Sequence, residues 1–133
     1  RLCSSAASDV YKRQYHYFDR KEFYDKSKDM ALAVSFEFDD YPSGYSNWFD
    51  VLYNFKSKFY EVAILGNEAV EKSNLINLKY IPNKLIVGSD KKNDLPLLKN
   101  RFVEGKTLIY VCVNKTCKLP TENTSESITM IKF

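Results

Sequence analysis

The sequence has little glycine, proline, cysteine and histidine, and no long hydrophobic run. Its 133 residues include four glycines, four prolines, three cysteines and one histidine. No apolar stretch approaches the roughly 18–20 residues that a membrane-spanning helix needs, so we expect a soluble protein without a membrane partner. The only histidine, His16, lies just past a doubtful opening segment, residues 1–14. It is therefore not a credible base for a Ser-His-Asp centre. Gly66 alone stands in the turn "GNEAVEK", so neither a dinucleotide fingerprint nor a P-loop is predicted, and no cofactor is expected.

The residues that are present are typical of a folded protein. The chain is 44% hydrophobic, 15% aromatic and 28% charged, which excludes a disordered tail. Its length allows one modest domain with a real hydrophobic core. A formal charge of +3 gives no reason to expect a nucleic-acid partner. We predict a cytoplasmic location.

The opening segment, "RLCSSAASDVYKRQ", differs in character from the rest of the chain. It resembles a translated sequencing-adapter read-through that recurs at the ends of metagenome-derived proteins. A signal peptide is disfavoured because the segment lacks an apolar core of about 7–15 residues. We therefore leave residues 1–14 out of the fold prediction, as an expected artefact. Without their three basic residues and one acidic residue the net charge of +3 falls to +1, and Cys3 is lost.

Residues 15–60 are predicted to form a helical hairpin from the end of an α/α toroid. In the first half, apolar side chains recur at spacings near 3.6 and share one helix face. These residues are Phe23, Met30, Val34 and Phe38. Pro42 and Gly44 then interrupt the pattern, and Ser46 or Asn47 can cap a second helix. The apolar stripe of that helix is Trp48, Val51, Leu52, Phe55 and Phe59.

Residues 61–133 are predicted to form a small α/β subdomain. "EVAILG" and "KLIVGS" have the apolar content of buried strands, and the helical pattern between them predicts a right-handed βαβ unit. The expected inward residues of this helix are Ala69, Val70, Leu75 and Leu78. "DLPLLKNRF" predicts another short helix, "TLIYVCVN" a third strand with "TCKLP" as its antiparallel return, and "SESITMIKF" a final helix. The predicted fold class is mixed α/β.

Cys112 and Cys117 raise four alternatives. A structural zinc site usually needs four protein ligands, and the chain offers too few. A thioredoxin-like pair uses C-x-x-C at a helix N-terminus, whereas here the spacing is C-x4-C and Cys112 lies in a strand. A disulfide is feasible, because "VNKT" can turn the chain and bring the cysteines opposite each other, but nothing indicates an oxidising compartment. We favour a hairpin whose cysteines pack as small apolar residues.

Two other clusters have simple explanations. Trp48 lies among aromatic residues that could stack on a sugar, although core packing between helices is the stronger expectation. Asp39 and Asp40 are predicted to be a solvated helix end, since acid–base chemistry needs a carboxyl group in an apolar or coupled environment. No catalytic, cofactor-binding or metal-binding residue is predicted.

Several segments occur together in one known family. They are "YPSGYSNW", "YEVAILG", "YIPNKLIVGS", "LPLLKNR" and "TLIYVCVNKTCKLPTEN". From about Ser27 to its end, the chain resembles the C-terminal end of thioredoxin-domain-containing proteins of the spermatogenesis-associated protein 20 type. A terminal strand of the form Y-V-C-x4-C-x2-P is characteristic of that family. The matching residues are Tyr110, Val111, Cys112, Cys117 and Pro120.

The resemblance implies that this chain is a C-terminal fragment of a longer protein. Family members carry an N-terminal thioredoxin-like domain and a helical toroid similar to six-hairpin glycosidases and N-acylglucosamine 2-epimerases. The family's redox residues have no counterpart here. We therefore expect a non-catalytic fragment that completes the toroid, with the remainder of the parent chain as its partner. Phe23–Phe38 and Trp48–Phe59 should expose an apolar face that the missing hairpins would cover.

Two alternatives stay open. The parent could be a carbohydrate-active enzyme, epimerase- or glycosidase-like, with Asn47 and Trp48 lining its cavity against a carbohydrate-like small molecule. Cys112 and Cys117 could instead form a redox-partner surface that meets the thioredoxin-like domain. Exposed sulfurs within bonding reach would favour the redox alternative. A cavity beside Asn47 and Trp48 would favour the carbohydrate alternative.

Overall fold

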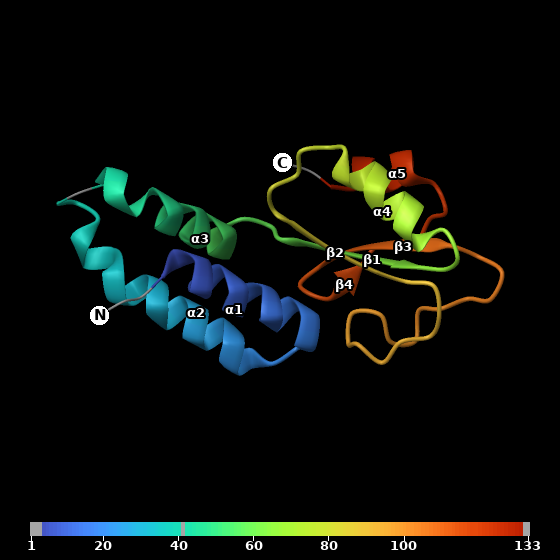
Figure 1. The fold of residues 1–133 in the computed structure, drawn as a ribbon, viewed down its shortest axis with the longest axis horizontal. Coiled ribbons are helices and arrows are strands. Elements are labelled where there is room, and N and C mark those ends of the chain that lie inside the picture. Colours follow the sequence, from blue (N-terminus) through green and yellow to red (C-terminus); the bar gives the residue numbers. More distant parts are fainter. Residues whose placement is uncertain (1–3, 41, 132–133) are drawn as a thin grey trace. The chain divides into compact units, whose positions relative to one another are not determined.

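The structure is a computed structural model that describes residues 4–40 and 42–131 (Figure 1). Within these ranges the fold is mixed α/β, as predicted, with helices leading into a small four-stranded sheet. The chain divides into two compact units, a helical unit of residues 1–58 and an α/β unit of residues 59–133. Among the described residues, no helix combines the length and apolar content that crossing a membrane requires.

The described part of the helical unit contains three α-helices, α1 (Ser5–Phe18), α2 (Lys21–Val34) and α3 (Ser46–Lys56). α1 and α2 run side by side in opposite directions, and Asp19 turns the chain between them with a left-handed φ of 55° (Figure 1). In the described residues two short 3-10 helices follow α2. η2 (Pro42–Tyr45) falls at the predicted break, whereas η1 (Ser35–Glu37) lies within the predicted first helix. α1 begins within residues 1–14, which the fold prediction left out, and extends into the predicted hairpin, so the described unit has one helix more than predicted.

A small apolar core joins α2 and α3. Its buried members are Ala31, Phe38, Trp48 and Val51. Trp48 and Val51 confirm the stripe predicted for the second helix, whereas Phe59 is buried as part of the α/β unit. Phe23, predicted on the same face as Phe38, instead stacks on Tyr11 of α1, with the ring centroids 6.1 Å apart.

The helical unit also leaves apolar side chains in solvent. Leu32 and Phe36 lie one helical turn apart in α2 and η1, and Phe49 and Tyr53 lie one turn apart in α3. Their exposed fractions range from 44% for Phe49 to 72% for Phe36. The exposed apolar face predicted for these two segments is therefore present in part, although Trp48 in the same segments is buried.

The described part of the α/β unit holds one sheet. Its strands are β1 (Tyr60–Leu65), β2 (Lys84–Ser89), β3 (Leu108–Val113) and β4 (Thr116–Cys117), in the order β2-β1-β3-β4. β1 and β2 are parallel and connect through α4 (Ala69–Asn77), which confirms the predicted βαβ unit. β3 pairs antiparallel with β1, and β4 returns antiparallel along β3, as predicted.

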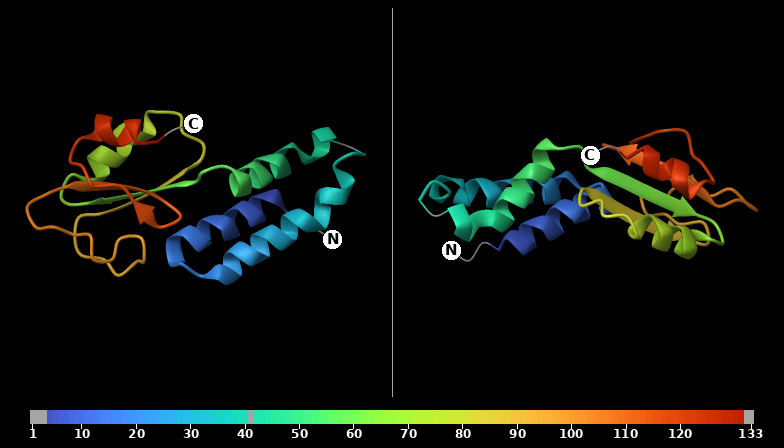
Figure 2. Two further views of the ribbon diagram at one scale, coloured as in Figure 1. Left: turned by 180° about the vertical axis from the view of Figure 1, so that it is seen from behind. Right: turned by 90° about the horizontal axis from the view of Figure 1, so that it is seen from above.

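The sheet of the α/β unit lies between two layers. α4 and α5 (Thr124–Thr129) cover one face, and the segment of residues 90–107 passes across the other (Figure 1, Figure 2). The helix-covered face carries the main core, Tyr60, Val62, Ile64, Ala69, Ile76, Ile81, Ile109, Val111 and Ile131. Alternation along β1 places Glu61 on the opposite face. All six residues of β1 are buried, because both faces are covered.

The predicted inward face of α4 is wrong at all but one position. Ala69 is buried, but Val70, Leu75 and Leu78 are exposed, and Ile76 is the residue that reaches the core. α4 spans only nine residues, and Leu78 falls beyond its end. So short a helix contacts the sheet along a narrow line. Ala69 and Ile76, two turns apart, are enough to make that contact.

Residues 95–100 form a turn and not the predicted short helix. The N–H groups of Leu98 and Lys99 both donate to the Leu95 carbonyl, at 2.8 and 2.9 Å, which makes a single helical turn. Asn100 then adopts a left-handed φ of 62°, which ends the turn. The chain therefore changes direction immediately before Arg101.

Candidate thiol site

The site begins with a tight hairpin between β3 and β4. Asn114 and Lys115 link the strands with φ values of 48° and 66°. Positive φ at both positions defines the type I′ turn, whose twist suits two-residue hairpins. This turn fixes the register that places Cys112 directly opposite Cys117.

Cys112 and Cys117 are joined by a disulfide. The Lys118 N–H donates to the Val111 carbonyl at 3.0 Å, so the adjacent cysteines occupy a non-hydrogen-bonded pair, where cross-strand side chains approach most closely. The favoured prediction, in which the cysteines pack as free apolar residues, is therefore wrong. The hairpin itself was predicted correctly, and its register explains why the sulfurs meet.

The two cysteines differ in their access to solvent. Cys112 is fully buried in β3. Cys117 is partly exposed on β4, a two-residue strand at the edge of the described sheet. A reagent in solution therefore meets the disulfide from the Cys117 side.

Arg101 brings a positive charge to the disulfide. Its Nη1 donates to Cys112 Sγ at 3.4 Å. Tyr110 holds Arg101 in two ways, because its hydroxyl donates to the Arg101 carbonyl at 2.9 Å and its ring lies 5.4 Å from the guanidinium carbon. A guanidinium remains charged at any pH a protein meets, so the Cys112 sulfur has a permanent cationic neighbour.

Glu61 lies opposite Cys112 in the register between β1 and β3 and is fully buried. Its Oε2 accepts the Lys115 N–H at 2.9 Å, which ties β1 to the hairpin turn. The side chain of Lys115 is a separate group from this backbone N–H, and desolvation lowers the pKa of its ammonium from the ordinary value. Sequence reasoning missed Glu61, although a carboxylate inside the apolar run "YEVAIL" is a signal that could have marked it.

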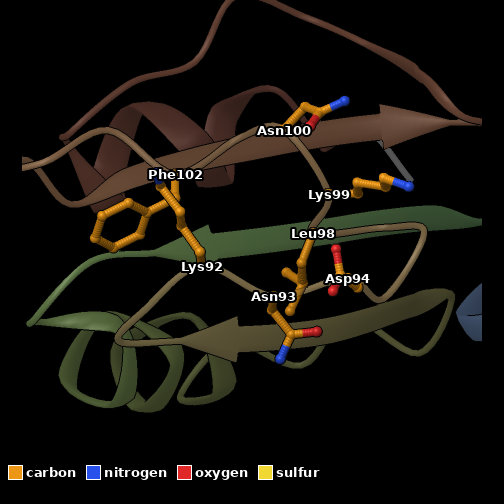
Figure 3. Close-up of a pocket in the computed structure, with 7 residues that line it drawn as sticks. All are labelled: Lys92, Asn93, Asp94, Leu98, Lys99, Asn100 and Phe102. Atoms are coloured by element: carbon orange, nitrogen blue, oxygen red, sulfur yellow. The ribbon is translucent and has the colours of Figure 1, made fainter.

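A cleft of about 410 Å³ opens beside the segment that carries Arg101 (Figure 3). Its lining residues are Lys92, Asn93, Asp94, Leu98, Lys99, Asn100 and Phe102. Figure 3 shows that they come from two stretches, residues 92–94 and residues 98–102, with Lys92 beside Phe102 and Asp94 beside Leu98. Asn100 and Phe102 flank Arg101 in the sequence, so the cleft borders the thiol site. Its charged and amide side chains belong to exposed residues of both signs, which favours no single ligand class.

A smaller cleft of about 180 Å³ lies at the carboxyl end of β1, the usual ligand position of parallel α/β folds. Gly66 has a φ of 134°, and a Cβ there would lie 2.4 Å from the Lys106 carbonyl oxygen. Thr107 Oγ1 accepts the Glu68 N–H at 3.2 Å. The close approach of these two segments explains Gly66 by packing.

Asn47 and Trp48, the predicted cavity-lining residues, lie at the start of α3. Asn47 is exposed, and Trp48 is 6% exposed within the core that joins α2 and α3. Neither residue lines either of the two clefts described above. An indole ring packed in this way has no free face for stacking on a sugar.

Comparisons with family models, curated proteins and solved structures find no match to this chain. The family resemblance seen in the sequence therefore stays a prediction.

Proposed function

We propose that the chain is a non-catalytic, C-terminal structural part of a larger, cytoplasmic thioredoxin-domain protein, in which its helical unit completes a toroid of helical hairpins. One observation carries this proposal: Leu32, Phe36, Phe49 and Tyr53 are exposed as pairs one turn apart. Grouped apolar side chains in solvent are typical of surfaces that another polypeptide covers. The partner would be the remainder of the parent chain, with no nucleic acid or membrane involved.

A variant with glutamine at Leu32, Phe36, Phe49 and Tyr53 tests this proposal. The unaltered chain should self-associate as its concentration rises, because an uncovered apolar face can bury itself against a second copy. The variant should stay monomeric in sedimentation experiments. Its free energy of unfolding should change by no more than about 0.5 kcal/mol for each of Leu32, Phe36 and Tyr53, as is usual for exposed positions. Phe49→Gln should cost about 0.5–1.5 kcal/mol, because the Phe49 ring lies 4.9 Å from the ring of the core residue Phe38.

The matched control is the double variant Val70→Gln and Leu78→Gln. Both residues are exposed apolar side chains, but they belong to the α4 region of the α/β unit. This variant should associate as the unaltered chain does. A chain that stays monomeric at high concentration would contradict the proposal, and so would a fourfold variant that cannot fold, because its side chains would then belong to a complete core.

The disulfide favours a second function, thiol–disulfide exchange at Cys112 and Cys117. Cytosolic thiols mostly stay reduced, and the disulfides that do form in mesophilic cytosol are usually transient, catalytic or redox-sensing. The type I′ turn holds the two cysteines in register independently of the bond between them, so the pair can open and close without rearranging the strands. This is the redox-partner surface considered from the sequence.

Thiol counting on the Cys3→Ser variant tests the second function. Thiols are counted with a maleimide after removal of the reductant and denaturation in acid, because Cys112 is fully buried. The oxidised chain should show no thiol, and treatment with a few millimolar dithiothreitol in native buffer should yield two. Oxidation by air should then restore the unreactive state. A disulfide that resists the reductant until the chain is denatured would be purely structural and would rule out the exchange function.

A further inference from the structure

The two sulfurs of the hairpin are not equivalent. We infer that Cys117 is the sulfur attacked by an incoming thiol, that Cys112 is the leaving thiolate, and that Arg101 is a positioning residue that stabilises this thiolate. The inference rests on the exchange function proposed above and adds its direction. Its substrates are thiols that can reach a strand at the edge of the sheet.

Access selects Cys117 as the point of attack. Exchange requires a thiolate to reach one sulfur in line with the bond that breaks. Cys112 is fully buried, whereas Cys117 is partly exposed on β4 at the edge of the described sheet. Attack at Cys117 therefore needs no opening of the sheet, and attack at Cys112 does.

The neighbouring charges select Cys112 as the leaving group. A buried thiolate is ordinarily unfavourable, because burial in apolar surroundings raises the pKa of a thiol. Arg101 Nη1 lies 3.4 Å from Cys112 Sγ and provides a compensating charge. Glu61, a carboxylate, also stands opposite Cys112 in the register of β1 and β3. Its Oε2 is hydrogen-bonded to the backbone of the hairpin turn, because it accepts the Lys115 N–H at 2.9 Å.

The exchange balances with two equivalents of a thiol such as glutathione. The first glutathione thiolate forms a bond to Cys117 Sγ, the Cys112–Cys117 bond breaks, and its electron pair remains on Cys112. A second glutathione thiolate attacks the glutathione sulfur of the mixed disulfide and releases the Cys117 thiolate. The cysteines take up two protons, so that the pair is reduced by two electrons and glutathione is oxidised to its disulfide.

Mapping the mixed disulfide tests the point of attack. The oxidised Cys3→Ser chain is mixed briefly with glutathione, quenched in acid, denatured and capped with a maleimide. Trypsin cleaves after Lys115 and separates the two cysteines, so mass spectrometry can locate each group. We expect glutathione on Cys117 and maleimide on Cys112, with at least tenfold preference. The same treatment in denaturant should remove most of this preference.

Substitution of Arg101 tests the leaving group. Arg101→Gln should slow the first exchange step roughly threefold to tenfold, because a nearby opposite charge shifts a thiol pKa by about 1–3 units and exchange rates follow the pKa of the leaving thiol. Arg101→Lys should recover most of the rate. Lys99→Gln is the matched control, since it removes the same charge from an exposed residue of the same segment. All variants should react equally in denaturant.

The possible outcomes separate the inference from the function on which it rests. A chain that glutathione and dithiothreitol reduce only in denaturant would contradict the exchange function itself. A chain reduced in native buffer with glutathione on Cys112, or on both cysteines equally, would leave exchange standing and overturn its direction. Equal rates for Arg101→Gln and the unaltered chain would overturn the role of Arg101.

Discussion

Lys12 shows what burying a single charge does to the helical unit. Its ammonium donates to the Asn54 carbonyl and lies 5.0 Å from the centre of the Phe55 ring. Desolvation lowers the pKa of Lys12 to about 8, and the carboxylate of Asp9 offsets part of this effect. The folded helical unit therefore holds the Lys12 proton less tightly than the unfolded chain does.

The pH dependence follows from this difference. The Lys12 pKa is 10.5 in the unfolded chain and about 8 in the folded one, so stability should rise as the pH increases from about 8 to about 10.5. Lys12→Met should remove this rise and stabilise the unit at pH 7 by up to about 3 kcal/mol. Urea unfolding followed by Trp48 fluorescence at several pH values measures both effects.

Lys28→Met is the control for this prediction, because Lys28 is exposed on α2. It should change neither the stability at pH 7 nor the dependence on pH. Equal pH profiles for Lys12→Met and the unaltered chain would show that burial of Lys12 carries no free-energy penalty.

At the scale of elements, the junction between β1 and α4 depends on one residue without a side chain. Gly66 has a φ of 134°, and a Cβ at this position would lie 2.4 Å from the Lys106 oxygen and 2.6 Å from the Thr107 Cα. Its N–H donates to the Ser89 carbonyl at 3.0 Å, which continues the pairing of β1 with β2. Neither the backbone angle nor the available space admits another residue.

Gly66→Ala should accordingly destabilise the α/β unit by roughly 3 kcal/mol or more, because the backbone of residues 106 and 107 must move. Gly105→Ala is the matched control. Gly105 also has a positive φ, 75°, but a Cβ there meets nothing within 4 Å. That change should cost about 1 kcal/mol. Thermal unfolding of both variants measures the difference, and equal costs would show that the close contact at Gly66 is unimportant.

The elements that sequence reasoning placed correctly are those with a clear local signal. β1, β2 and β3 are apolar runs of strand length, and the residues between β3 and β4, Asn114 and Lys115, indicate the hairpin turn. The buried face of α4 was predicted wrongly because the helix has more apolar residues than the sheet can contact, and Ile76 was not considered. Residues 95–100 were predicted as helix because local pattern does not reveal that Asn100 ends the turn with a positive φ.

At the scale of the whole molecule, the two units should unfold separately. The single tryptophan, Trp48, lies in the small core of the helical unit, whereas the sheet has its own larger core. Trp48 fluorescence should therefore change at lower urea concentration than the circular dichroism signal of the sheet. Coincident transitions would indicate one cooperative structure and would contradict the division into two units.

The thiol site could be predicted only in part, because it depends on contacts between distant segments. The spacing of Cys112 and Cys117 and the turn between them are visible locally. Arg101 reaches Cys112 only because a segment without regular structure crosses the sheet, and no periodicity signals that contact. The disulfide depends on the register between β3 and β4, which places Cys112 opposite Cys117. The spacing of the two cysteines alone does not determine that register.

The position of β1 within its sheet has a consequence for the order in which the α/β unit assembles. β1 pairs with β2 through a short crossover that contains α4, and with β3 only after the chain has passed through residues 90–107. Closing the longer loop loses more chain entropy, so the β1–α4–β2 unit should form first and serve as the nucleus. β3 would then add to an existing edge. Its hairpin with β4 closes a loop of only two residues, so the cysteines can meet before β3 joins the sheet.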